Sequence, residues 1–143
     1  MGPLEHRVSF KVYYEDTDCL GVVYYANYLR FMERGRSEFL AAHGGSVQEW
    51  NARGIAVVVH SLSMTFRRPG RLGDLLDVIS TFRVDSPYKG VFGQRIECAG
   101  TVLVKAEVVV ACLDADQRLI AAPDELRALG QDGGVVPGVG QAR

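Results

Sequence analysis

Three carboxylates lie within four residues near the start of the chain, in the segment Glu15-Asp16-Thr17-Asp18. A lone glycine, Gly21, and a run of aromatic residues follow them. A carboxylate held against an acyl carbon can act as a general base or as a nucleophile. The more ordinary interpretation is that these acids cap the helix that follows and remain in solvent. Spacing alone does not decide between the two.

The segment after the acids would supply the second part of an acyl-transfer site. Gly21 permits a tight turn, and the amides of Tyr24 to Ala26 lie at the predicted start of a helix. The first amides of a helix have no intrahelical acceptor, and together with the helix dipole they stabilise a developing oxyanion. A carboxylate facing an acyl carbon, with amides facing its oxygen, is the minimum equipment for acyl transfer.

The helix that would present these amides is predicted over residues 24–43. Apolar side chains recur there at steps of three and four, and Gly44-Gly45 end the pattern. Gly35 lies on the apolar stripe in mid-helix, where a glycine costs about 1 kcal/mol relative to alanine. We therefore predict that the helix backbone approaches a neighbouring element closely at Gly35.

One strand precedes this helix, and four follow it. Alternating or β-branched patterns between turn signals predict strands over residues 8–14, 55–66, 75–84, 91–98 and 101–113. Short connections between the last three predict an antiparallel meander. Pro123 can open a short helix that ends at Leu129.

This order predicts an α+β fold, in which one long central helix is wrapped by a curved antiparallel sheet of about five strands. The length of 143 residues suits a single domain, which we place at residues 1–130. We expect the glycine-rich segment 131–143 to form a disordered tail.

The composition narrows the classes of partner. A net charge of -1 provides no bulk attraction for nucleic acid or an anionic membrane, and no apolar run approaches the roughly 20 residues of a membrane span. Three cysteines without a CxxC spacing argue against a disulfide framework or a zinc site, and favour free thiols in the cytoplasm. With no ligand cluster and no phosphate-binding glycine motif, we expect no metal and no cofactor.

Two segments resemble a known family. DTDCLGVVYYANYLRFMERGRSEFL (residues 16–40) resembles the signature of the 4-hydroxybenzoyl-CoA thioesterase-like branch of the hotdog-fold superfamily, and is most similar to the Tol-Pal-associated acyl-CoA thioesterases. FRRPGRLGDLLDV (residues 66–78) resembles the second strand of that family, its proline turn and the start of the next strand. The resemblance implies a hotdog fold and a hydrolase that cleaves an acyl-CoA thioester to a carboxylic acid and free CoA.

The same resemblance implies roles for individual residues. Asp18 would be the catalytic carboxylate, as nucleophile or general base, and the backbone N–H at about Tyr25 would polarise the carbonyl. Many relatives carry histidine where this chain has Tyr25, which puts the acyl specificity in question more than the reaction class. We expect Asp16 to hold the acidic loop and Asn27 to hydrogen-bond to it. The expected substrate-binding residues are Gly21, Val23, Tyr24, Tyr28, Ser63, Met64 and Phe66.

Coenzyme A carries anionic phosphates, which a nearly neutral protein must bind with a local basic patch. Arg67 and Arg68 stand at the Pro69-Gly70 turn, and Lys89 lies in the next hairpin. We expect these cations to bind the phosphates, although solvated turn charges would look the same in the sequence.

The resemblance also implies self-association, because subunits of this fold pair their sheets edge to edge and place their sites at the interface. We therefore expect a homodimer or homotetramer. A non-catalytic module of the same fold that binds acyl-CoA or acyl carrier protein is the main alternative, and binding without turnover would identify it. Dehydratases of this fold need a histidine that the segment around Asp18 lacks. The sequence leaves the acyl group and the thiol carrier open.

Overall fold

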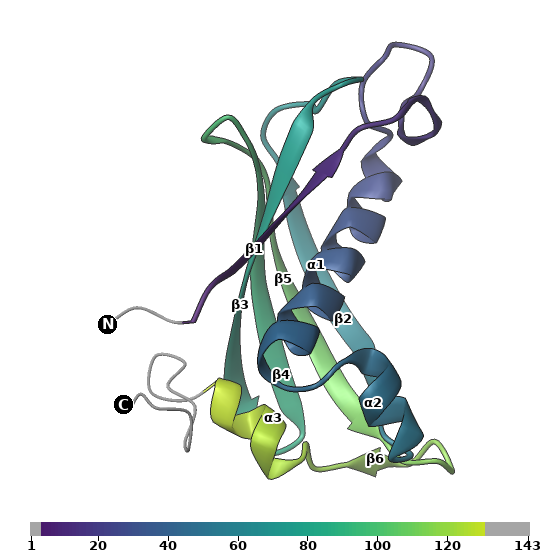
Figure 1. Ribbon diagram of the computed structural model, residues 1–143, viewed down its shortest axis with the longest axis vertical. Coiled ribbons are helices and arrows are strands. Elements are labelled where there is room, and N and C mark those ends of the chain that lie inside the picture. Colours follow the sequence, from purple (N-terminus) through teal and green to yellow (C-terminus); the bar gives the residue numbers. More distant parts are fainter. Residues whose placement is uncertain (1–3, 131–143) are drawn as a thin grey trace.

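The computed structural model describes residues 4–130, and Figure 1 shows one long helix lying across one face of an antiparallel sheet. The helix is α1, Tyr28–His43. The strands are β1 (His6–Lys11), β2 (Ala56–Phe66), β3 (Leu75–Ser86), β4 (Lys89–Cys98), β5 (Thr101–Leu113) and β6 (Leu119–Ile120). The shorter helices are the 3₁₀ turns η1 (Tyr14–Asp16) and η2 (Tyr25–Asn27), α2 (Val47–Ala52) and α3 (Asp124–Leu129).

The sheet is antiparallel throughout, with the strand order β1-β3-β4-β5-β2 and the short β6 paired to β5. The meander β3-β4-β5 is as the connections predict. The hotdog fold is confirmed, and the sheet exceeds five strands only through the two residues of β6. The loops at residues 12–27 and 67–74 lie together at the upper end of Figure 1, while α2, α3 and β6 lie at the lower end.

The core lies between α1 and the inner face of the sheet. The buried side chains of α1 recur at the predicted helical spacing and pack among the inward-facing residues of β3, β4 and β5. Arg36 is also buried, but its guanidinium donates to Gln94 Oε1 at 3.0 Å and to Glu33 Oε1 at 2.8 Å. Gln94 in turn donates to the Met32 carbonyl at 3.0 Å. These bonds satisfy a buried charge that would otherwise destabilise the core.

Gly35 is the point of closest approach between α1 and the sheet. A Cβ on this residue would lie 2.5 Å from Val78 Cγ1, 3.2 Å from Gln94 Nε2 and 3.3 Å from Ser80 Oγ. Such overlap with a buried valine cannot be relieved without moving the helix. The close approach predicted from the position of this glycine is confirmed.

The chain departs from the predicted elements at both ends of the acidic loop. The first strand ends at Lys11 rather than at residue 14, because the chain turns into η1 after Val12. The α-helix begins at Tyr28 after the separate turn η2. Helix α2 was not predicted, although Ser46 and Glu49 form a reciprocal capping box that is visible as S-x-x-E in the sequence.

The predicted tail at 131–143 lies outside the described residues, and the domain boundary at residue 130 stays a prediction. Within residues 4–130, none of the helices combines the length and the apolar character needed to cross a bilayer.

We expect Gly35→Ala to lower the free energy of unfolding by about 2 kcal/mol. Overpacking costs about 1–3 kcal/mol, and a Cβ only 2.5 Å from Val78 Cγ1 belongs at the upper end of that range, so this cost outweighs the ~1 kcal/mol that alanine contributes to helix propensity. Urea unfolding followed by circular dichroism measures the difference. Glu38→Ala, at an exposed position of the same helix, is the control and should stay within about 0.5 kcal/mol of the wild type. A Gly35→Ala protein as stable as the wild type would contradict the close approach.

Candidate active site

The acidic loop is anchored at its base by backbone pairing and by Asp16. Val12 N–H donates to the Asp74 carbonyl at 2.8 Å, which joins the end of β1 to the chain just before β3. The Asp16 carboxylate is buried and accepts from Tyr13 N–H at 2.8 Å. The Asp16 carbonyl accepts from Asn27 Nδ2 at 3.1 Å and from Tyr24 N–H at 3.0 Å. The expectations that Asp16 holds the loop and that Asn27 bonds to it are both confirmed.

Asp18 occupies the turn at the tip of this loop and is partly exposed. Its N–H donates to the Val22 carbonyl at 2.9 Å, and its carbonyl accepts from Gly21 N–H at 3.1 Å. Gly21 has a φ of +78°, which closes the turn in a conformation that favours glycine. Asp18 Oδ1 accepts from Leu20 N–H at 2.8 Å, and no protein group within residues 4–130 donates to Oδ2. One carboxylate oxygen is therefore oriented while the other stays available to a ligand or water.

The amides at the start of η2 are available as well. Val23 N–H donates to the Gly70 carbonyl at 2.8 Å, and Asn27 N–H donates to the Tyr24 carbonyl at 2.8 Å. The N–H groups of Tyr25 and Ala26 have no acceptor in the described part of the chain. Because Tyr24 is bonded to Asp16, these two amides lie directly beside the loop that carries Asp18. The structure thus brings a carboxylate oxygen and unsatisfied amides into one region.

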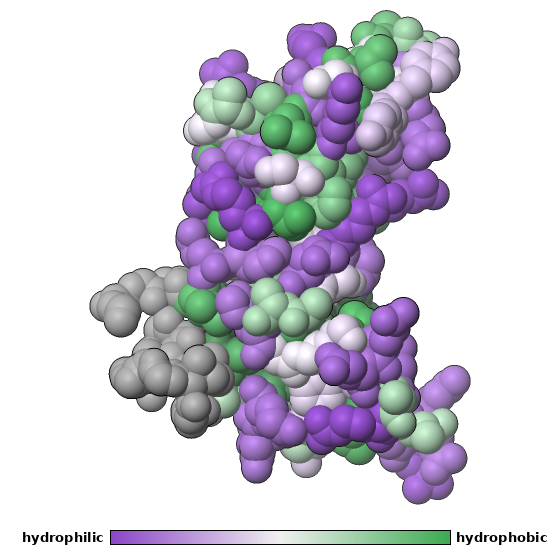
Figure 2. Space-filling view, viewed as in Figure 1, coloured by the Kyte–Doolittle hydropathy of each residue, from purple (hydrophilic) through white to green (hydrophobic). Residues whose placement is uncertain are grey.

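An apolar cavity of about 250 Å³ opens next to these groups. It is lined by Val23, Tyr25, Tyr28, Phe66, Arg67, Arg68 and Pro69. The Phe66 ring lies between two tyrosines, with centroids 6.0 Å from Tyr25 and 5.9 Å from Tyr28. Tyr24 packs on Tyr25 at 5.1 Å. Figure 2 shows apolar residues interspersed with hydrophilic ones at this upper end of the molecule, and six of the predicted site residues line this single cavity.

Arg67 and Arg68 have fixed backbones and exposed side chains. Both N–H groups donate to the Leu103 carbonyl, at 2.7 Å and 3.2 Å. Neither guanidinium is paired with a carboxylate within residues 4–130. Two unpaired cations therefore border the cavity, where they can meet an anionic ligand.

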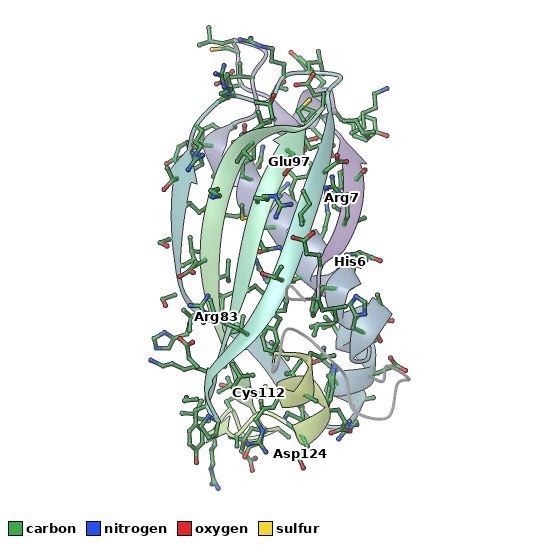
Figure 3. The ribbon with its side chains drawn as sticks, turned by 90° about the vertical axis from the view of Figure 1, so that its left-hand side faces the viewer. His6, Arg7, Arg83, Glu97, Cys112 and Asp124 are labelled. Carbon is green, nitrogen blue, oxygen red and sulfur yellow. The ribbon has the colours of Figure 1, made fainter. Side chains whose placement is uncertain are left out.

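Lys89 does not join these arginines within the chain, contrary to the expectation. Strand β3 carries the chain away from the 67–74 loop, so the hairpin that follows lies at the opposite end of the molecule. There Lys89 lines a small apolar pocket with Cys112 and Leu126, and Figure 3 shows Cys112 near that lower end. β3 has 12 residues, and at roughly 3.3 Å per residue a strand of this length places the hairpin after it far from the arginines before it.

Ser63 and Met64 are neighbours in β2, but they point to opposite faces of the sheet. Met64 packs against the core. Ser63 lines a polar hollow on the outer face, together with Thr81 and Lys105. Figure 3 shows this outer face, which bears charged pairs such as Arg83 with Glu107 at 3.1 Å. Ser63 is therefore separated from the cavity by the sheet itself.

Gly70 is a site residue that the sequence did not single out. Its N–H donates to the Tyr28 hydroxyl in α1, and its carbonyl accepts from Val23 N–H before α1. A Cβ on Gly70 would lie 3.2 Å from Val23 Cγ2. Its only signal in the sequence was the Pro69-Gly70 pair, which predicts a turn but not what the turn contacts.

Comparison with known proteins places the sequence of this chain in a family. Residues 20–83 match the family model described as the thioesterase superfamily. The acyl-CoA thioester hydrolase YbgC of Escherichia coli strain CFT073 is 43% identical over 109 residues, which are 76% of this chain and 81% of that relative. The chain belongs to the thioesterase superfamily. The family resemblance of residues 16–40 and 66–78 is thereby confirmed.

Solved structures of thioesterases share the fold of this superfamily member. A probable thioesterase from Bartonella henselae superposes with a TM-score of 0.79 at 32% identity, over 84% of this chain and all of that one. A 4-hydroxybenzoyl-CoA thioesterase in complex with 4-hydroxybenzoyl-CoA gives a TM-score of 0.80 at 17% identity, over 88% of this chain and 98% of that one, which shows the shared fold alone. The matched family region begins after Asp18.

Proposed function

We propose that this thioesterase hydrolyses acyl-CoA thioesters to a carboxylic acid and free CoA. The observation that carries the proposal is that Asp18 Oδ2 and the N–H groups of Tyr25 and Ala26, none of which has a partner within residues 4–130, lie in one region beside an apolar cavity. The relatives named acyl-CoA thioester hydrolases support the substrate class. The apolar wall suits an acyl group, and the two unpaired arginines suit the phosphates of CoA.

Two reaction courses fit the site. As general base, Asp18 takes a proton from water while the water oxygen bonds to the thioester carbon. As nucleophile, Asp18 Oδ2 bonds to that carbon itself and forms an acyl anhydride, which water then hydrolyses. In both courses the amides donate to the oxyanion of the tetrahedral intermediate. The C–S bond then breaks and CoA leaves as the thiolate, which takes up a proton.

We expect Asp18→Asn to lower kcat for acyl-CoA hydrolysis by about 10³-fold, within the range of 10²–10⁴ known for a positioned acid or base. The amide oxygen can still accept from Leu20 N–H, so the loop should keep its shape. Thiol release from a panel of short, medium, long and aromatic acyl-CoA esters measures the loss.

Glu15→Gln, at an exposed acid of the same loop, controls for lost charge and should keep wild-type turnover. Asp18→Asn activity equal to wild type would reject the mechanism. Wild-type protein that binds acyl-CoA without any turnover would instead favour the binding-module alternative, and an acyl carrier protein ester in the panel tests the other thiol carrier.

The Arg67 and Arg68 guanidinium groups should raise affinity for the CoA phosphates. We expect the Arg67→Gln/Arg68→Gln double variant to raise KM about tenfold and to leave kcat little changed, because an exposed ion pair contributes about 0.2–1 kcal/mol and two such losses approach the ~1.4 kcal/mol that corresponds to tenfold. The effect should shrink as salt increases. Lys89→Gln removes a cation at the end of the molecule opposite the cavity and should leave KM unchanged. A rise in KM for Lys89→Gln alone would contradict the assignment of phosphate binding to Arg67 and Arg68.

We further propose that two chains pair along β2 to complete the site. β2 is hydrogen-bonded to β5 on one side only. Residues 59–63 are all exposed, including side chains that point to the inner face of the sheet. Among them, Val59 is 42% exposed and Leu62 43% exposed. A long apolar edge of this kind is normally covered, and a second copy that continues the sheet would cover both its backbone and its inner face.

Light scattering during size-exclusion chromatography should give a mass about twice the 15.7 kDa of the chain, or about four times for a dimer of dimers. Leu62→Lys should shift the protein toward the monomer, because a charge on a buried edge opposes pairing. Activity should fall with the dimer fraction. A wild-type monomer at micromolar concentration would reject the proposal.

The cytoplasm is the compartment that fits best. Cys19, Cys98 and Cys112 are all free thiols, as the odd number and spacing predict, and thiols persist in a reducing compartment.

A further inference from the structure

The Tyr28 side chain lines the cavity, but its hydroxyl is already bonded to another part of the chain. It is only 3% exposed, and its hydroxyl oxygen accepts from Gly70 N–H at 2.9 Å. Burial raises the pKa of the Tyr28 phenol, as does the nearby Asp74 carboxylate, while the Gly70 bond lowers it. The phenol therefore stays neutral, and its oxygen remains a permanent partner for the Gly70 amide.

Gly70 is hydrogen-bonded to both ends of the segment 23–28, which carries the Tyr25 and Ala26 amides, and so forms a closed ring of bonds with it. Its N–H bonds to Tyr28 and its carbonyl accepts from Val23 N–H at 2.8 Å. Residues 23–28 are thus fastened at both ends to one residue, and the Tyr25 amide lies between the two attachment points. Gly70 is held tightly in this position, because a Cβ would lie 3.2 Å from Val23 Cγ2 and 3.4 Å from the Tyr28 hydroxyl.

Asp18 is connected to this ring of hydrogen bonds through Val22. Asp18 N–H donates to the carbonyl of Val22, the residue before Val23. Val22 also forms a bridge with Arg71, the residue after Gly70. A displacement of Gly70 would therefore move the turn of Asp18 and the Tyr25 amide relative to each other.

We propose that Tyr28 is a positioning residue, which sets the Tyr25 amide against Asp18 by holding Gly70, and that it does so without binding the acyl group. This inference rests on the proposed thioester hydrolysis. Its basis is that a misplacement of about 1 Å in a catalytic group can cost about 100-fold in rate. Within residues 22–28, Tyr28 supplies the side chain that holds Gly70, whereas the Asn27 side chain holds the Asp16 carbonyl.

The rival interpretation is that Tyr28 contacts the substrate, since it lines the cavity. The two roles differ in their kinetic signature. Loss of a contact made equally in the ground state and the transition state raises KM, whereas loss of geometry needed only in the transition state lowers kcat.

Tyr28→Phe removes the hydroxyl and keeps the ring. We expect kcat to fall about 10- to 100-fold for every acyl-CoA that the wild type hydrolyses. KM, and the Kd of a non-hydrolysable thioether analogue, should stay within about twofold of wild type. Tyr88→Phe, which removes an exposed hydroxyl at the far hairpin, should match the wild type in all three quantities.

Amide hydrogen exchange followed by NMR gives a readout that does not depend on turnover. In Tyr28→Phe the Val23 amide should exchange about tenfold faster or more, because its acceptor Gly70 is released. The Val12 amide, which bonds to Asp74, should be unchanged.

Three outcomes would overturn the inference: an unchanged kcat, an unchanged Val23 exchange rate, or a KM and Kd that rise while kcat holds. Wild-type protein that hydrolyses no acyl-CoA would reject the proposed function and the catalytic part of this inference together. Wild-type turnover with an unaffected Tyr28→Phe variant would reject the role of Tyr28 alone.

Discussion

Backbone hydrogen bonds between the acidic loop and the 67–74 loop hold the site together. Val12 pairs with Asp74, Val23 with Gly70, and Leu72 N–H donates to the Gly21 carbonyl at 3.1 Å. Each such bond contributes only about 0.5–1.5 kcal/mol net, but the set fixes two segments that lie some 50 positions apart in sequence. Asp18 and the Tyr25 amide belong to the first segment, and the arginines to the second. The relative placement of the two segments therefore depends on this backbone pairing, together with the bond from Gly70 N–H to the Tyr28 hydroxyl.

The pairing of these loops positions the amides of η2 only because α1, which follows η2, is fixed against the sheet. The helix packs so closely that Gly35 leaves no room for a methyl group beside Val78. The network of Arg36, Gln94 and Met32 ties the helix backbone to β4. A helix held in this way cannot slide along its axis without opening the core. The turn η2 at its start is consequently a rigid platform for amides, which is what stabilisation of an oxyanion requires.

The binding surface of a single chain is open to solvent on one side. The cavity is open on the side of Phe66, which is 49% exposed, and β2 leaves apolar side chains uncovered. An acyl group in this cavity would keep part of its surface in water unless another chain covered it, and the edge of β2 is placed to bring one. The proposed chemistry uses residues of one chain, while in the proposed dimer the depth of the acyl pocket would depend on both chains.

Several features followed from the sequence because their causes are local or periodic. Helical spacing placed the buried stripe of α1, alternation placed the long strands, and a glycine on the stripe marked the close approach at Gly35. The motif around Asp18 gave the family. The tertiary structure alone decided which distant residues meet. It separated Lys89 from Arg67 by the length of β3, and it put Ser63 behind the sheet. It also showed that Tyr28, a lining residue of the cavity, accepts the hydrogen bond of Gly70. The face that a strand turns to the helix and the pairing of loops depend on contacts between segments far apart in the chain, and no local pattern encodes them.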